Sequence, residues 1–236
     1  MTLRQAIYNS RFFGALKIQK LRDEWVINKI RGLDESARLI DAGCGSQRYR
    51  KYCSHVLYTG QDIAEYSMDS NTTIEASIGS QDGYEFGSLD IISDINEIPV
   101  KDESFDAVLC TEVFEHAADP VRAINEFHRI LIKGGSLILT VPSSTIRHMD
   151  PYYYYSGFSD NWLRHHLKDK FEIIELLPVA DYYRVIAIEL ARIMSTHSIF
   201  SKIALAIPFL YLMAKRKTPK SIATQCYGYH ILAKKI

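Results

Sequence analysis

The sequence predicts a doubly wound (Rossmann-like) α/β domain with a mostly parallel seven-stranded sheet, an antiparallel last strand and helices on both faces. Short apolar runs alternate with segments of helical periodicity, an order typical of parallel strands joined by crossover helices. One apolar run near the N-terminus leads into an acid and a tight glycine turn, Asp41-Ala42-Gly43-Cys44-Gly45. At 236 residues the chain is long enough for one large domain of this class.

The elements are predicted from periodicity and from the residues that start and stop them. Strands are expected where short runs are rich in apolar and β-branched residues, at Arg38–Ala42, Val56–Gln61, Leu89–Asp94, Phe105–Cys110, Ser136–Val141, Phe171–Leu177 and Gly228–Ala233. Helical spacing predicts helices at Lys17–Arg31, Pro120–Ile132, Ser159–Leu167 and Tyr182–Met194. Asp119 before Pro120 and the residue Ser159 are expected N-caps. Gly134-Gly135 is the expected helix stop.

The domain organisation is predicted from where the strand-and-helix alternation begins and ends. Residues 1–36 are expected to form a helical cap, residues 37–180 and 226–236 the main domain, and residues 181–225 a helical insertion. Inside the insertion, Ile203–Ala214 is an apolar run interrupted by Pro208, and Lys215-Arg216-Lys217 follows. The run is shorter than the roughly 20 residues of a membrane span. It is therefore interpreted as a lid over a pocket, a dimer face or a membrane-contact element.

Composition narrows the class of protein. Hydrophobic residues make up 47% and charged residues 24%, an ordinary globular balance. Lys+Arg and Asp+Glu both number 28, and this zero net charge disfavours a dedicated nucleic-acid binder. The four cysteines form no Cys-x-x-Cys pair, which is untypical of a zinc knuckle or a disulfide framework. With no secretory signal pattern, the chain is expected to be cytoplasmic or peripheral to a membrane.

The glycine turn is expected at the carboxyl end of the first strand, where open α/β sheets bind ligands. Without Cβ atoms, Gly43 and Gly45 let the backbone bend sharply and approach a ligand. A dinucleotide site needs a third glycine so that a pyrophosphate can rest on the start of a helix. Arg48 stands at that position. The turn therefore favours an adenosylmethionine site over a dinucleotide site.

Two further acids end the next two predicted strands. Asp62 lies between Gln61 and Ile63, and its carboxylate suits both hydroxyls of a ribose. Asp94, after Ser93, suits an adenine amino group, and Ile95 offers a backbone donor and apolar contact to the ring. Three acids in this order, each after its own apolar strand, are rarely without function.

From Arg38 to Pro142 this series of motifs resembles the class I S-adenosylmethionine-dependent methyltransferases, particularly their type 11 group. The resemblance implies that the glycine turn holds the methionine end of the cofactor, Asp62 the ribose and Asp94 the adenine. It implies that residues after the fourth strand line the methionine and the acceptor. The residues expected to bind the cofactor are Asp41, Ala42, Gly43, Cys44, Gly45, Gln61, Asp62, Ile63, Ser93, Asp94, Ile95, Cys110 and Thr111.

The catalytic candidates are Glu112, His116 and His148. If the segment after Thr111 is helical, Glu112, Glu115 and His116 share one face by i, i+3, i+4 spacing. This pattern resembles the Glu-x-x-Glu-His of ubiquinone-pathway O-methyltransferases, where it is metal-linked. It is also widespread in type 11 enzymes without metal. A base, an acceptor-orienting residue, a structural role and, with least weight, a metal site therefore stay open.

The acceptor is expected to present an oxygen. Tyr152, Tyr153 and Tyr154 form an amphipathic wall expected to bind substrate. Methyltransferases acting on amides or adenines usually carry an Asn-Pro-Pro-aromatic turn, where this chain has Thr111-Glu112-Val113-Phe114. A small molecule, sugar or lipid-linked intermediate is therefore favoured over a nucleic acid. The alternatives are a non-catalytic adenosylmethionine-binding protein and, with less support, an NAD-dependent oxidoreductase.

Overall fold

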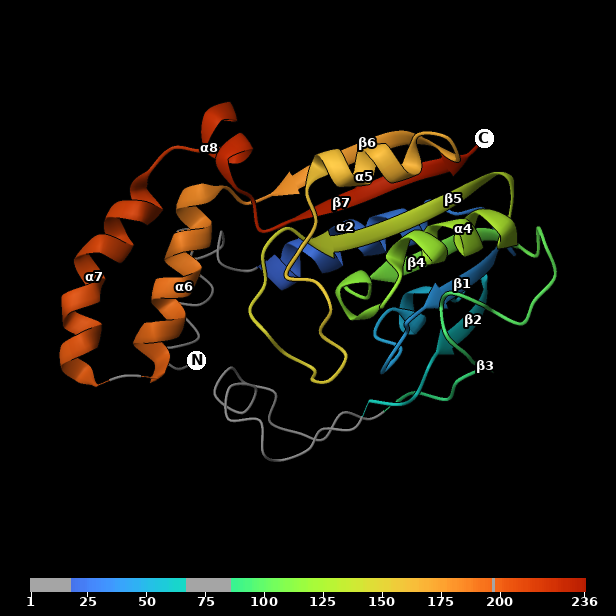
Figure 1. Cartoon of the computed structure of the whole chain (residues 1–236), viewed down its shortest axis with the longest axis horizontal. Helices are drawn as coiled ribbons and strands as arrows, with labels where there is room; N and C mark the ends of the chain where they lie inside the picture. The colour runs from blue at the N-terminus through green and yellow to red at the C-terminus, as the bar shows by residue number, and fades with distance from the viewer. Residues whose placement is uncertain (1–17, 67–85, 197) are drawn as a thin grey trace.

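The computed structural model describes residues 18–66, 86–196 and 198–236. These residues contain a seven-stranded sheet with the order β3-β2-β1-β4-β5-β7-β6 (Figure 1). The strands are β1 (Arg38–Ala42), β2 (Leu57–Asp62), β3 (Ile91–Ile92), β4 (Phe105–Thr111), β5 (Leu131–Pro142), β6 (Phe171–Val179) and β7 (Gly228–Lys235). All neighbouring pairs are parallel except β5–β7 and β6–β7, so the predicted fold class is confirmed.

Helix α2 (Ile18–Arg31) covers one face of the sheet. Its buried residues Val26 and Ile30 pack with Leu39 of β1, Leu109 of β4 and Ile138 of β5. Burying these side chains removes apolar surface from water and fixes the helix against the central strands. The start of α2 consequently lies near the carboxyl ends of those strands.

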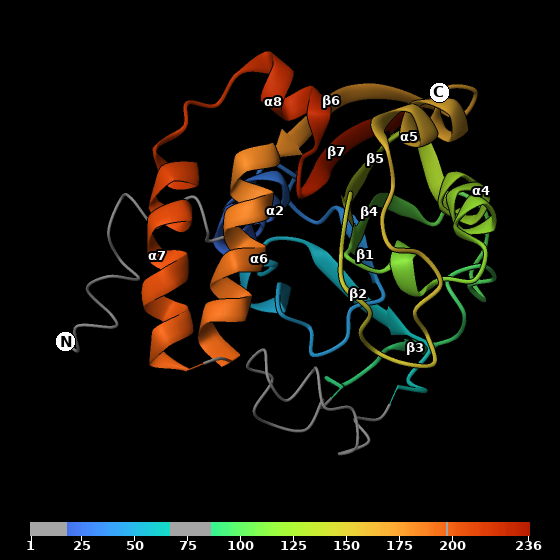
Figure 2. The same cartoon turned by 60° about the vertical axis from the view of Figure 1, so that its left-hand side comes forward.

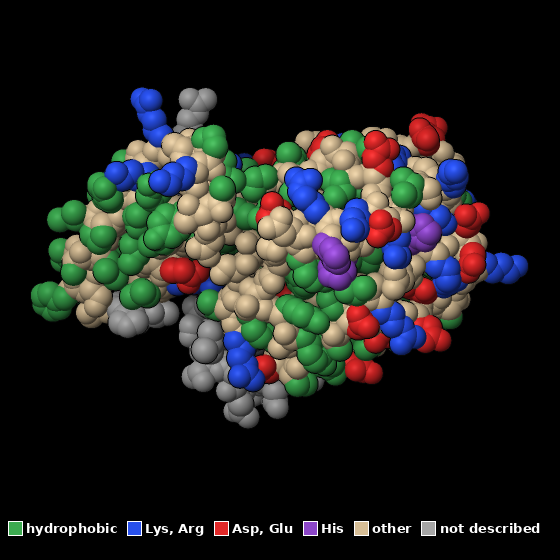
Figure 3. All heavy atoms as spheres, turned by 45° about the horizontal axis from the view of Figure 1, so that its top comes forward, with side chains coloured by type: hydrophobic (Ala, Val, Ile, Leu, Met, Phe, Trp, Pro, Cys, Tyr) green, Lys and Arg blue, Asp and Glu red, His purple; other side chains and the backbone are tan. Residues whose placement is uncertain are grey.

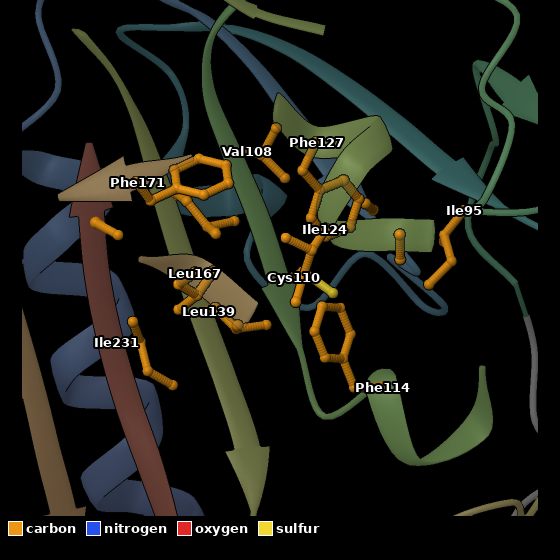
Figure 4. Packing of buried hydrophobic residues seen from close by; sticks show 14 of the residues in the cluster. Ile95, Val108, Cys110, Phe114, Ile124, Phe127, Leu139, Leu167, Phe171 and Ile231 are labelled. Carbon is orange, nitrogen blue, oxygen red and sulfur yellow. The ribbon is translucent and has the colours of Figure 1, made fainter. Parts of the chain in front are cut away.

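The opposite face carries α4 (Pro120–Ile130) and α5 (Asp160–Leu167). In α4, Ile124 and Phe127 recur on one side of the helix and are buried, as an amphipathic helix on a sheet requires. Figure 4 shows them around Cys110 of β4 together with Phe114 from the short 3₁₀ helix η3 (Phe114–His116). This core holds the segment after β4 firmly against the sheet.

The predicted N-caps are confirmed. The Asp119 carboxylate accepts a hydrogen bond from the Arg122 N–H at 3.0 Å, and the Ser159 hydroxyl accepts one from the Trp162 N–H at 3.1 Å. Each satisfies a backbone donor that the first helical turn leaves unpaired.

Two predicted boundaries are wrong. Helix α4 ends at Ile130 instead of near Gly134, because Leu131 already pairs with Phe105 in the sheet. Gly134, at φ +77°, lies in the irregular stretch before regular pairing resumes. The third strand shrinks to Ile91–Ile92, because the Asp90 carboxylate accepts the Gly60 N–H at 2.7 Å in place of a strand-to-strand bond. The stretch Asp69–Gly87 is polar and rich in glycine and serine, which predicts a long loop, and it lies outside the described residues except for Phe86 and Gly87.

Three helices connect β6 to β7: α6 (Tyr182–Thr196), α7 (Ile199–Ala214) and α8 (Pro219–Thr224). Figures 1 and 2 show α6 and α7 side by side at the end of the sheet toward which β5 and β6 run. Ala187 of α6 and Phe209 and Met213 of α7 form a small separate core. No helix among the described residues has both the length and the apolar character to cross a membrane.

Candidate active site

A cavity of about 560 Å³ opens at the carboxyl ends of the parallel strands. Strands β2 and β4 flank β1 on opposite sides, so the loops after β1 and β4 diverge and leave a crevice between them. Segments following β1, β2, β3 and β4 all contribute to the lining, as does α2. The volume lies within the range of small-molecule sites.

The glycine turn forms one wall of this cavity. Gly43 and Gly45 have φ of +74° and +49°, which L side chains adopt only with strain. A Cβ on Gly43 would come within 2.5 Å of the Val113 side chain, so the turn also packs directly against the segment after β4. The N–H groups of Gly43 and Cys44 donate to the Gln61 carbonyl, which ties the turn to β2.

Asp41 lies at the base of the cavity and is only 2% exposed. Tyr58 donates a hydrogen bond to its carboxylate at 2.8 Å. Burial raises the pKa of Asp41 to about 7, the neighbouring Asp62 adds to this rise, and the Tyr58 hydrogen bond opposes it. The site is therefore prepared for a cationic group, which would offset the cost of burying this charge.

Asp62, Ile63, Asp94 and Ile95 also line the cavity. The Asp62 carboxylate accepts the Gly45 N–H at 2.9 Å and the Ala64 N–H at 3.1 Å. Each carboxylate oxygen has room for a further hydrogen bond. Acceptor groups beside two isoleucine side chains suit a ligand that combines hydroxyl groups with a flat ring.

Four residues predicted to bind the cofactor do not line the cavity. Ala42 and Cys110 are fully buried, and Figure 4 shows the Cys110 sulfur among core side chains. The Gln61 amide donates to the Ser93 carbonyl and so braces two of the loops. Each follows or precedes a lining residue in the chain, and successive side chains in a strand point to opposite faces. These four residues lie behind the residues that line the cavity and support them.

Glu112 lines the cavity but is engaged by two partners. Thr140 Oγ1 donates to it at 2.9 Å, and Arg22 Nη1 lies 3.6 Å from its other oxygen. Burial lowers the pKa of Arg22, but Glu112 and other neighbours raise it by more. The pKa therefore lies above its ordinary value, and this guanidinium stays charged. Sequence reasoning missed Arg22, because nothing in the helix pattern shows which residue of α2 meets the cavity.

His116 also lines the cavity, and its Nδ1 lies 2.9 Å from the Tyr152 carbonyl. A carbonyl oxygen only accepts, so Nδ1 carries the proton and Nε2 the lone pair. His148 is arranged similarly, with Nδ1 at 2.8 Å from the Ile146 carbonyl, and its ring meets that of His116 edge-on at 4.7 Å. His148 does not line the cavity, so any effect that it has on a ligand there is indirect and passes through its contact with His116.

Glu115, His116 and His148 each offer a ligand atom, and these atoms lie within 4.8 Å of one another. Two imidazoles and a carboxylate are a donor set that transition metals accept. This trio differs from the predicted Glu112, Glu115 and His116, since η3 begins at Phe114 and leaves Glu112 outside the turn. Burial, with nearby Glu112, raises the pKa of Glu115 well above its usual range.

Two of the three predicted tyrosines line the cavity, and the third does not. Tyr152 and Tyr154 line it, and the Tyr152 hydroxyl donates to Glu65 at 3.1 Å. Tyr153 does not line the cavity, and its hydroxyl donates to the Thr145 carbonyl at 2.8 Å. Alternation along an extended segment accounts for the division.

Further lining residues escaped the sequence analysis: Ser46, Arg48, Tyr49, Glu65, Tyr66, Phe86, Val113, Ala117, Ala118 and Met149. Arg48 and Tyr49 both reach Asp23 of α2, at 3.0 Å and 2.8 Å. The departure from a third glycine thus fixes the turn to α2. Their position directly after the glycine turn was the one available signal.

The chain is similar in sequence to known methyltransferases. Residues 40–139 match the type 11 family described as "Methyltransferase domain". A ubiquinone biosynthesis O-methyltransferase of Alkalilimnicola ehrlichii is 26% identical over 125 residues, which are 52% of this chain and 48% of that protein. The chain spans about half the length, or less, of the first curated relatives that it matches.

Solved structures show the same fold. A SAM-dependent methyltransferase from Aquifex aeolicus has a TM-score of 0.51 at 16% identity, with 95% of this chain and all of that one covered. SpnF, a [4+2]-cyclase, has a TM-score of 0.56 at 20% identity, with 92% and 80% covered. Since these titles describe different reactions, the fold by itself does not decide the chemistry.

Proposed function

We propose that the chain transfers a methyl group from S-adenosylmethionine to an oxygen atom of a small molecule, sugar or lipid-linked intermediate, because residues 40–139 match the type 11 methyltransferase family. One observation carries the proposal. Asp41, Asp62 and Asp94, which end three separate strands, border a single cavity together with the glycine turn. Each carboxylate also accepts a hydrogen bond within the fold, but their position around one opening suits a ligand that carries several donor groups.

The hydrogen-bond acceptors that line the cavity fit S-adenosylmethionine. Asp41 would accept from the ammonium group at the methionine end, where a cation relieves its burial. Asp62 would accept the ribose hydroxyls, and Asp94 the adenine amino group, with Ile63 and Ile95 against the ring. When bound, S-adenosylmethionine supplies an electrophilic methyl group and leaves as S-adenosylhomocysteine.

His116 is the residue that we assign as general base. Its Nε2 would take the proton of the acceptor hydroxyl while the oxygen forms its bond to the methyl carbon and the carbon–sulfur bond breaks. His148 would hold the His116 ring through their edge-on contact. Tyr152 and Tyr154 would provide the acceptor wall, and exclusion of water by the bound ligands would favour a displacement in which charge is dispersed.

Turnover of methyl-labelled S-adenosylmethionine with a panel of hydroxylated acceptors tests this assignment. His116→Gln should lower turnover by roughly 10²–10⁴-fold, the usual contribution of a positioned base. Its affinity for S-adenosylhomocysteine should stay unchanged in calorimetry. His165→Gln, an exposed histidine of α5, is the matched control. Unaltered turnover in His116→Gln would show that another group removes the proton.

A chelator arm separates the base from a metal site. Because the proposed step uses His116 as a base, EDTA should leave turnover unchanged. If EDTA abolishes it and a divalent cation restores it, Glu115, His116 and His148 act as metal ligands instead. If wild type binds S-adenosylmethionine but forms no product with any acceptor, the chain is a binding protein that keeps the fold.

A further inference from the structure

Helix α7 presents an apolar face that nothing in the described part of the chain covers. Phe209 and Met213 turn inward against α6, whereas Phe200, Ile203 and Ile207 are 79%, 65% and 77% exposed. Three further apolar side chains extend this exposed face along the helix: Ile199, Leu210 and Tyr211. Figure 3 shows hydrophobic side chains gathered over the helix pair, with Lys and Arg at its upper end. Monomeric soluble proteins rarely leave a contiguous patch of this kind open to water.

Charge is distributed unevenly around this face. From Leu190 to Thr224, which includes α7 and α8, the sequence contains six basic residues and no acidic one, although the whole chain has no net charge. Arg216, Lys217 and Lys220 are exposed just beyond the end of α7, and Lys202 lies on the helix itself. The Lys215 ammonium lies 4.3 Å from the centroid of the Tyr211 ring, which joins the basic group to the apolar face. Such asymmetry indicates an anionic partner.

From these observations we propose that the face formed by Ile199, Phe200, Ile203, Ile207, Leu210 and Tyr211 binds the surface of an anionic lipid bilayer. The helix would lie in the plane of the interface, with its apolar face among the acyl chains and the basic residues at the headgroups. A second copy of the chain is a poorer occupant, because it would bring the same uncompensated positive charge to the contact. A nucleic acid would match the charge but would leave the aliphatic side chains in water.

A position at a membrane surface would serve the active site, but binding to the membrane does not depend on the active site. Helices α6 and α7 lie at the same end of the sheet as the cavity, since β6, which precedes α6, runs in the same direction as the strands whose carboxyl ends border the cavity. A lipid-linked acceptor would therefore be presented close to the cavity, a consequence that rests on the proposed function. The lipid binding itself requires neither cofactor nor turnover.

Flotation of the full chain with vesicles tests the proposal. The protein should float with vesicles of equal parts phosphatidylcholine and phosphatidylglycerol, and high salt should weaken this binding. It should bind phosphatidylcholine vesicles far more weakly. S-adenosylhomocysteine affinity, measured in parallel by calorimetry, should be the same in every variant, so that failure of lipid binding is distinguishable from failure of the proposed function.

Two sets of substitutions separate the apolar and the basic contributions. The triple variant Phe200→Ser, Ile203→Ser, Ile207→Ser should lose vesicle affinity by roughly a hundredfold or more. The triple variant Arg216→Gln, Lys217→Gln, Lys220→Gln should lose about a hundredfold, from roughly fivefold per basic residue. The matched controls change exposed residues elsewhere, Leu57, Ile174 and Ile236 to serine and Lys101, Lys133 and Lys168 to glutamine, and should bind as wild type does.

Three outcomes would overturn the proposal. The first is no flotation of wild type with anionic vesicles at low salt. The second is a serine triple that binds vesicles normally, which would leave charge alone as the cause. The third is a wild type that sediments as a dimer while the serine triple sediments as a folded monomer, which would assign the face to a second copy.

Discussion

A single buried carboxyl group, Asp41, links the stability of the protein to its readiness for a ligand. In the fold its pKa is about 7, against an ordinary value of 3.8, mainly because of burial. A folded-state pKa above the unfolded value means that stability is present at low pH and is lost as pH rises from about 4 to about 7. Three pKa units correspond to about 4 kcal/mol at full ionisation. Burial of the ionised carboxylate thus carries a cost that a bound cation would offset.

Asp41→Asn should therefore gain stability over wild type as pH rises, by about 2–3 kcal/mol more at pH 8 than at pH 5. The amide keeps an acceptor for Tyr58 but never ionises, which is the reason for the gain. Urea unfolding at the two pH values measures it. S-adenosylmethionine affinity should fall in the same variant. A stability difference independent of pH would show that ionisation of Asp41 is not its cause.

Gly43 is constrained twice, by its backbone and by its neighbour. Gly43→Ala should destabilise the protein by about 2 kcal/mol or more, since it combines a positive φ with a clash against Val113. Adding Val113→Ala should return part of that loss by removing the clash and leaving the φ strain. A double-mutant cycle with urea unfolding gives the coupling. Strictly additive effects would mean that the turn relaxes away from Val113.

At the scale of elements, α2 meets β7 through a stacked pair, Trp25 on His230, with ring centroids 5.0 Å apart. Burial, together with the positive charge of Arg22, lowers the pKa of His230 to about 4. A buried histidine of this kind holds the two elements together while it is neutral. Its folded-state pKa lies below the unfolded value, so the stability is present above pH 6.5 and is lost as pH falls toward 4.

His230→Phe should flatten that pH dependence. The ring still stacks on Trp25, but no proton is taken up on unfolding, so wild type should lose about 2 kcal/mol relative to the variant between pH 7 and pH 5. Asp41 has the opposite slope over the same range, and the measurement is best made in the Asp41→Asn background. A constant difference between the two proteins would assign the acid sensitivity to another group.

The end of a helix or strand can be predicted from sequence when local contacts determine it, and not when a tertiary contact does. The N-caps at Asp119 and Ser159 are local, and both were predicted correctly. The end of α4 was misplaced because pairing of Leu131 with β4 is a tertiary event that overrides the local preference of the glycines. Strand β3 is short for a similar reason. The Gly60 N–H donates to the Asp90 carboxylate and not to a backbone carbonyl of the neighbouring strand.

The site divides in the same way. Strand-end acids are predictable because carboxyl ends of parallel strands meet at one edge, and Asp41, Asp62 and Asp94 all border the cavity. Their neighbours in the chain, such as Cys110 and Gln61, do not, since a strand alternates its faces. Arg22 and the pairing of His116 with His148 come from segments distant in sequence, and periodicity carries no information on such contacts.

For the molecule as a whole, the cavity is the place where otherwise separate parts meet. Loops after five strands, β1 to β5, and the start of α2 line it, and polar contacts such as that of Arg48 with Asp23 join some of these parts. A ligand that contacts all of them would stabilise the folded state without acting on the unfolded one. The free energy gained follows from mass action, and it depends on affinity and not on which loop is ordered.

S-adenosylmethionine should therefore raise the melting temperature, and NAD should not. At about 100 times its Kd a ligand adds about 2.7 kcal/mol, and for a chain of this length that corresponds to a shift of about 5–10 °C. Asp62→Ala should abolish most of the shift, because it removes an acceptor for the ribose and the bond that holds Gly45, whereas Asp169→Ala, an exposed control, should retain it. Differential scanning calorimetry measures all three proteins. An equal shift with NAD would return the glycine turn to a dinucleotide site, and no shift with either ligand would remove the basis for assigning the cavity to a nucleoside.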